Sequence, residues 1–102
     1  MASATAAYRL NPEMQEQLGT GVLRLIVRGE TVIGRYGRHG YVNGALRGRV
    51  LTATLRDGVH HAVLHVIFTE NYVSFEGFYR PALGGEAQEL RCHGTRITRR
   101  RS

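Results

Sequence analysis

The sequence lacks lysine and tryptophan altogether, and it has one cysteine, Cys92, and two prolines. A single cysteine cannot form an intramolecular disulfide, so the fold must be stable without one. There is neither a secretory hydrophobic segment nor an apolar run long enough to cross a bilayer, and we expect a cytoplasmic protein without membrane contact. A chain of 102 residues can form one domain that buries roughly 65% of its unfolded surface, which is sufficient for a core.

The short motifs of common enzyme classes are also missing. There is no G-x-S-x-G, no phosphate-binding glycine loop, no Cys-x-x-Cys pair and no paired carboxylates at a strand end. Cys92 and His93 are adjacent in a predicted strand, so their side chains should diverge rather than meet as a nucleophile and its base would. His61 and His65 would lie roughly 13 Å apart along one strand face, too far for one metal ion. We therefore expect no enzyme activity, no catalytic residue, no metal site and no cofactor.

All 14 basic residues are arginines, and with 8 acidic residues the formal net charge is +6. Two explanations fit a basic chain without lysine. One is a GC-rich genome, and the other is selection for the planar guanidinium group, which binds anions through two parallel hydrogen bonds. The charge favours an anionic partner, either a nucleic acid or the acidic surface of a protein.

Residues 40–80 contain three consecutive hairpin patterns in which apolar and polar residues alternate in phase. The strongest signal is Asp57-Gly58 between two alternating runs, because this dipeptide suits a two-residue turn. Similar turns are expected at residues 47–48 and 70–71, and four strands then share one apolar face. The last of these turns would also place His65 opposite Glu76. Agreement between turn chemistry and strand phase predicts a sheet.

Residues 22–36 predict a further hairpin, with its turn at residues 29–30. In this register Arg24 lies opposite Arg35 on the outer face, and facing like charges are unfavourable unless an anion lies beside them. Together with Arg28 on the same face, they form a candidate anion patch. The alternatives are arginines that extend into water, or a longer loop that shifts the register.

The residues before this hairpin predict a short helix that starts at Asn11-Pro12 and ends near Gly19, because Asn favours the cap position and Pro the first helical position. Its apolar side, which includes Met14, could close an open barrel end. An irregular arm packed on the sheet is the alternative.

Glycines recur inside the strand patterns, where they usually mark bends or close backbone approach. About seven short antiparallel strands predict an all-β up-and-down meander with one short N-terminal helix, curled into a small barrel or a strongly curved sheet. A two-layer sandwich is the structural alternative. We expect a flexible N-terminal tail at 1–9, a single barrel domain at 10–97 and a basic C-terminal tail at 98–102. Residues 81–88 form the longest loop, which makes them the candidate binding loop.

Three segments carry a resemblance: V-N-G-A-L-R-G-R-V-L-T-A-T-L at 42–55, F-E-G-F-Y at 75–79 and C-H-G-T-R at 92–96. Their order resembles small glycine-rich bacterial β-meander proteins of unknown function, in which the closing strand reads W-x-G-T-R. Cys92 stands where that pattern has Trp. The succession of strands and glycines is also broadly similar to that of avidin-like and lipocalin-like barrels. The resemblance implies a barrel fold and a binding cavity, without identifying a ligand.

Two surfaces follow from the predicted strand faces. The anion-binding set comprises the arginines of the first hairpin, the last strand and the tail: Arg24, Arg28, Arg35, Arg91, Arg96, Arg99, Arg100 and Arg101. The other surface is an outer face that is more apolar than a solvated sheet should be. It comprises His61, Val63, His65, Ile67 and Phe78. We expect self-association through this second face, as a homodimer.

Two function classes stay open from the sequence. The leading prediction is a non-enzymatic binding module that engages a nucleic acid or an acidic protein surface, as a phage or mobile-element inhibitor of a host system would. The alternative is a small-ligand barrel of avidin-like or lipocalin-like type, which an empty apolar cavity under the loop at 81–88 would favour. A cofactor-free enzyme that uses His65 or Cys92 has the least support.

Overall fold

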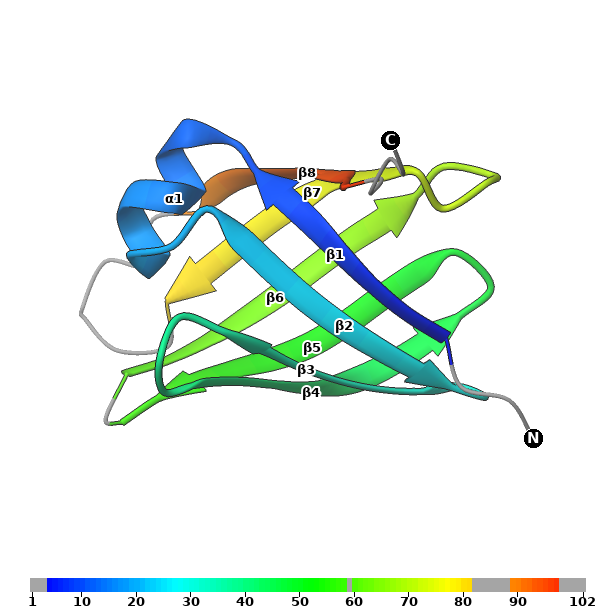
Figure 1. The fold of residues 1–102 in the computed structure, drawn as a ribbon, viewed down its shortest axis with the longest axis horizontal. Helices are drawn as coiled ribbons and strands as arrows, with labels where there is room; N and C mark the ends of the chain where they lie inside the picture. The colour runs from blue at the N-terminus through cyan, green and yellow to red at the C-terminus, as the bar shows by residue number, and fades with distance from the viewer. Residues whose placement is uncertain (1–3, 59, 82–88, 98–102) are drawn as a thin grey trace, which may run out of the picture.

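The computed structural model describes residues 4–58, 60–81 and 89–97 (Figure 1). Its elements are β1 (Ala4–Leu10), α1 (Pro12–Leu18), β2 (Val22–Arg28), β3 (Thr31–Tyr36), β4 (Gly40–Arg47), β5 (Val50–Asp57), β6 (His60–Phe68), β7 (Ser74–Pro81) and β8 (Leu90–Arg96). The strands form one closed antiparallel barrel in which consecutive strands pair and β1 also pairs with β8. The predicted all-β meander is confirmed as a barrel rather than a sandwich, with eight strands instead of about seven.

The additional strand is β1. It pairs with β2 along its length and with β8 through Tyr8, Arg9 and Leu10, so it closes the barrel. The prediction of a flexible tail over residues 1–9 is therefore wrong from residue 4 onward. The alanines that precede Tyr8 gave no apolar alternation, although Tyr8 and Leu10 are buried in the core. The predicted basic tail at 98–102 lies outside the described residues.

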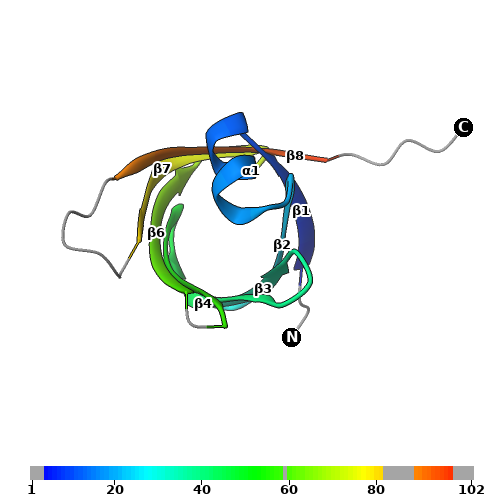
Figure 2. The same ribbon diagram turned by 90° about the vertical axis from the view of Figure 1, so that its left-hand side faces the viewer.

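The predicted short helix is confirmed as α1, with Asn11 at the N-cap position and Gly19 in the left-handed region (φ 71°) at the C-cap. The Asn11 side chain does not cap its own helix. Its amide donates to the carbonyl of Arg91 at 3.0 Å and accepts from the N–H of His93 at 2.9 Å, which ties α1 to β8. Viewed down the barrel, α1 lies across the near end of the ring (Figure 2), and its Met14 is fully buried.

In three hairpins a glycine with positive φ follows the first strand. The strand pairings make Gly29, Gly48 and Gly58 the first of the two residues that link their strands, with φ of 62°, 61° and 61°. Neither Glu30 nor Arg49, the second residue of two of these turns, has a positive φ. A positive φ at the first turn residue alone is the type II′ pattern, which favours glycine there.

This turn chemistry corrects two predicted registers. The prediction placed Gly48 and Gly58 second in their turns, and both hairpins are therefore shifted by two residues. For example, Asp57 pairs with His60, whereas the prediction left Asp57 in the turn. A shift of two residues preserves which side chains face inward, because the side-chain period of a strand is two. The predicted inner and outer faces therefore agree with the structure.

The connection between β6 and β7 also differs from the prediction. Residues 69–73 link the two strands in place of a two-residue turn, and Tyr72 adopts a φ of 58° within this loop. As a result His65 lies opposite Phe78, and Glu76 is paired with Ile67. The predicted pair of His65 with Glu76 is therefore wrong.

The barrel interior is filled by inward-facing side chains from all eight strands, and it contains no buried polar or charged residue among those described. Tyr8, Phe68 and Phe75 form an edge-to-face cluster with ring centroids 5.2 to 5.6 Å apart. The Phe75 ring packs directly on the Cα of Gly94, so a Cβ at that position would overlap the ring. Of the helices described, none has the length and apolar character needed to cross a bilayer.

Candidate functional site

Four outward-facing side chains lie directly opposite one another across β2 to β5. Arg24 pairs with Arg35, Arg35 with Tyr41, and Tyr41 with Arg56. We call these four residues the arginine row. Adjacent strands lie about 4.8 Å apart, so the row spans roughly 14 Å. The predicted register of Arg24 against Arg35 is confirmed.

The arginine row lines a groove of about 760 Å³ on the outer surface of the barrel, together with Ile26, Ile33 and His39. The Tyr41 side chain is 55% exposed. The Arg35 guanidinium carbon lies 5.1 Å from the centroid of the Tyr41 ring, which is a cation–π contact. The groove therefore combines three cations with one exposed aromatic ring and an apolar floor.

The charges of the row are not neutralised within the described part of the chain. There, ion pairs join Arg47 to Glu30 at 3.9 Å and Arg80 to Glu89 at 2.7 Å, and neither includes a residue of the arginine row. Facing like charges on adjacent strands destabilise a sheet. An anion bound between these strands would relieve that repulsion.

The other predicted anion-binding arginines do not belong to the row. Arg28 lies on the same outer face as Arg24 but four residues along β2, roughly 13 Å away. Arg91 faces outward from β8 on another side of the barrel, and Arg96 lines a pocket at one barrel end. The tail residues Arg99, Arg100 and Arg101 lie outside the described residues.

Arg56 and His39 also line this groove, although the sequence did not predict them as site residues. The predicted turn at residues 47–48 places Tyr41 opposite Thr54, whereas the structure pairs Tyr41 with Arg56. No register was predicted for β3 and β4, so the contact of Arg35 with Tyr41 was also missed. The positions of the turn glycines carry the signal that would have found the row.

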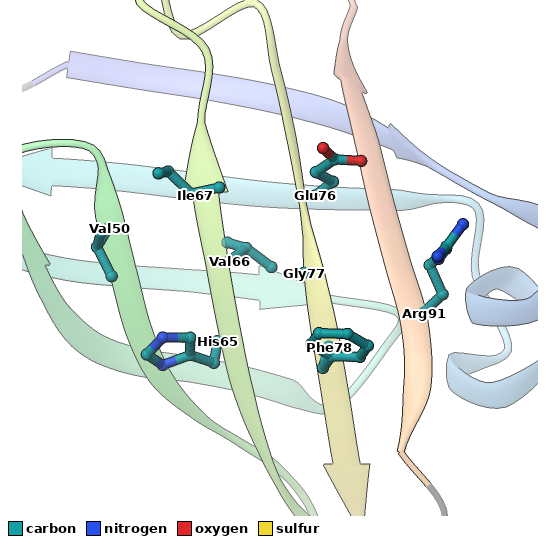
Figure 3. Close-up of a pocket in the computed structure, with 8 residues that line it drawn as sticks. All are labelled: Val50, His65, Val66, Ile67, Glu76, Gly77, Phe78 and Arg91. Carbon is teal, nitrogen blue, oxygen red and sulfur yellow. The ribbon is translucent and has the colours of Figure 1, made fainter.

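A second groove of about 440 Å³ crosses the outer surface from β5 to β8 (Figure 3). Eight residues line it, and we call four of them the apolar face: Val50, His65, Ile67 and Phe78. Ile67 and Phe78 are 47% and 50% exposed, and Glu76 and Arg91 flank them. This groove follows β5 to β8, whereas the arginine row crosses β2 to β5.

The structure brings together most of the predicted interface residues. His65, Ile67 and Phe78 line the second groove, and Val63 lies beside them on the outer face of β6 with 43% exposure. His61 is set apart, because it is partly buried and lines a separate pocket at the α1 end of the barrel. Nδ1 of His65 lies 3.3 Å from the Thr52 hydroxyl, within hydrogen-bond distance.

The residues considered for catalysis lack a reactive arrangement. Cys92 is buried, and this burial raises the pKa of its thiol to about 12, so the thiol stays protonated at neutral pH. Cys92 lies opposite Gly77, whereas His93 faces outward opposite Glu76. Within the described ranges, no group of three His, Cys, Asp or Glu side chains is arranged to hold a metal ion.

Comparison of the chain with protein-family models, with curated proteins and with solved structures found no match. The resemblance to glycine-rich β-meander proteins therefore stays a prediction.

Proposed function

We propose that the protein is a non-enzymatic binding module that engages single-stranded nucleic acid through the arginine row. The observation that carries this proposal is the alignment of Arg24, Arg35 and Arg56 with Tyr41 across four strands. A guanidinium group binds a phosphate through two charge-assisted hydrogen bonds, and the net charge of +6 steers polyanions toward the protein.

The exposed aromatic ring favours a single strand over a duplex. Tyr41 sits between Arg35 and Arg56 on the row, so one unstacked base could lie on its ring while phosphates on either side meet the arginines. In a duplex the bases are stacked on one another, and only the backbone would reach the row. An acidic protein surface would use the arginines and leave the ring without a defined role.

We expect a labelled oligothymidylate to bind more tightly than a duplex of equal length at low salt. The Arg35→Gln variant should weaken oligothymidylate binding about tenfold, since it removes a charge-assisted contact from the centre of the row. Fluorescence anisotropy measures both affinities. The matched control is Arg28→Gln, which removes the same charge from the same sheet face outside the groove.

Three results would contradict the nucleic-acid proposal. One is the absence of oligonucleotide binding at low ionic strength. Another is an equal loss of affinity in the Arg28→Gln and Arg35→Gln variants, which would indicate an effect of net charge alone. A third is salt-sensitive binding to polyglutamate without binding to oligothymidylate, which would favour an acidic protein as the partner.

We further propose that the apolar face pairs with the same face of a second copy. An interface with two-fold symmetry is self-complementary, so each Glu76 can approach Arg91 of the other copy while Ile67 and Phe78 bury their exposed surface. A sheet face this apolar is unusual for a monomer in water.

Replacing Ile67 with glutamate should convert the dimer to a monomer, because it places a charge in the centre of the buried face. Light scattering at high micromolar concentration measures the mass. The control variant is Ala45→Glu, which adds the same charge on the outer face of β4 at a residue that lines neither groove. A wild-type protein that is monomeric under these conditions would disprove the dimer.

A further inference from the structure

The barrel end opposite α1 contains a pocket that neither the arginine row nor the apolar face uses. It has a volume of about 390 Å³ and lies where β1 begins and where β2, β4, β6 and β8 end. Pockets that hold small ligands typically have volumes of about 300–1,000 Å³. We call it the mouth pocket. The small-ligand alternative placed its cavity instead under the loop at 81–88, most of which lies outside the described residues.

The walls of the mouth pocket are apolar because inward-facing residues form them. Leu25, Val27, Leu46 and Phe68 come from three strands on the inner face of the barrel. Beside them β1 contributes only the small side chain of Ala6, which lies opposite Leu25 at an inward position. The small residues of β1 therefore help to leave this space open.

One side of the mouth pocket is held in place by hydrogen bonds. The Tyr72 hydroxyl donates to the carbonyl of Gly48 at 3.0 Å, and the Tyr8 hydroxyl donates to the carbonyl of Tyr72 at 2.8 Å. The Tyr72 ring also packs on Phe68, with centroids 5.5 Å apart. A pocket that is already formed loses little conformational entropy when a ligand binds.

Arg96 supplies a positive charge at the rim of this pocket. In β8 the inward phase runs through Cys92 and Gly94 to Arg96, which lies opposite the inward-facing Tyr8. Arg96 forms no ion pair with any carboxylate in the described ranges. An arginine in the inward phase of a strand, beside an apolar pocket, is suited to hold the anionic head of an otherwise apolar molecule.

We propose that the mouth pocket binds a small amphipathic carboxylate. Its apolar part lies among Leu25, Val27 and Leu46, and its carboxylate accepts hydrogen bonds from the Arg96 guanidinium. The apolar walls disfavour polar ligands such as sugars, and the guanidinium disfavours cations. No residue of the arginine row lines this pocket, so we expect the two binding activities to be independent.

The test compares octanoate with octanol and octylamine on the full chain, by isothermal calorimetry and NMR titration. Octanoate should bind saturably and at least about tenfold more tightly than octanol, since only octanoate forms the charge-assisted contact. Octylamine should bind most weakly. The Arg96→Gln variant should lower the octanoate affinity to that of octanol and leave octanol binding unchanged.

Three further variants make the result specific. Arg91→Gln lies on the same strand in the outward phase and should keep octanoate binding. Ala6→Leu should abolish binding of both octanoate and octanol, because the larger side chain occupies the pocket. If Ala6→Leu does not fold, Ala4→Leu replaces it as the test, because it introduces the same larger side chain at the exposed rim of the pocket. In every variant, circular dichroism reports the fold.

The proposal is overturned if octanoate does not bind saturably, if octanol binds equally well, or if Arg91→Gln weakens octanoate as much as Arg96→Gln does. Two variants distinguish a failure of the carboxylate proposal from a failure of the nucleic-acid proposal. Arg35→Gln should leave octanoate affinity unchanged, and Ala6→Leu should leave oligothymidylate affinity unchanged.

Discussion

Replacing Gly94 with alanine is expected to destabilise the barrel by about 2–3 kcal/mol, because the added methyl group overpacks the core. The new Cβ would overlap the ring of Phe75, which is almost fully buried. That ring cannot easily move aside, since Tyr8 and Phe68 pack against it at centroid distances of 5.2 and 5.3 Å. Urea unfolding followed by circular dichroism measures the loss.

The control for this prediction is Gly21→Ala. A Cβ at Gly21 would meet only the flexible side chain of Gln15, at 3.4 Å, and the free energy of unfolding should change by less than about 0.5 kcal/mol. Phe75→Leu, combined with Gly94→Ala, should cost less than the sum of the two single changes, because the two sites are in contact. Equal stability of Gly94→Ala and the wild type would refute this packing.

Removing all three arginines of the row, as Arg24→Gln, Arg35→Gln and Arg56→Gln together, is expected to weaken oligonucleotide binding at least a hundredfold at low salt. Each phosphate contact to a single strand contributes about −0.7 to the slope of log affinity against log salt, so the slope should flatten by about 2. The loss should be similar for all sequences, because phosphate contacts do not distinguish bases. Anisotropy titrations over a series of salt concentrations measure both quantities.

The comparison variant replaces Arg99, Arg100 and Arg101 with alanine. It removes the same number of charges from the basic tail, and we expect the barrel to stay intact. The comparison therefore distinguishes oligonucleotide binding through the tail from oligonucleotide binding through the arginine row. If the tail variant flattens the slope and the row variant does not, the tail is the binding element and the row is not. Unfolding measurements on both variants exclude a loss of structure as the cause.

The sequence predicted which side chains face inward far better than it predicted which residues face each other. Residues such as Leu51 and Leu64 still face inward after a register shift of two residues, because the period of a strand is two. The same shift changes which residues are paired across neighbouring strands, and the pairing of Arg56 with Tyr41 was missed for this reason. The order of residues in each turn decides the register, and Gly48 illustrates how one misplaced glycine moves a whole hairpin.

The candidate sites differ in how much of each could be predicted from the sequence. The facing pair of Arg24 and Arg35 follows from one hairpin and was predicted. The mouth pocket depends on β1, whose alanines lack the β-branched and aromatic residues that usually indicate a strand. The inward phase of Arg96 can be read from the alternation of β8, but its apolar surroundings come from strands far away in the sequence.

The pairing of β1 with β8 has a kinetic consequence. Beside these paired strands, the His93 N–H donates a hydrogen bond to the Asn11 side chain, and the two residues are 82 positions apart in the sequence. Loop-closure entropy opposes such distant contacts, whereas the tight hairpins from β2 to β6 can form locally. During synthesis β1 leaves the ribosome before the other strands, yet one of its edges stays unpaired until β8 emerges. An unpaired edge can recruit a neighbouring chain, and the small, weakly apolar residues at the start of β1 make that recruitment less favourable.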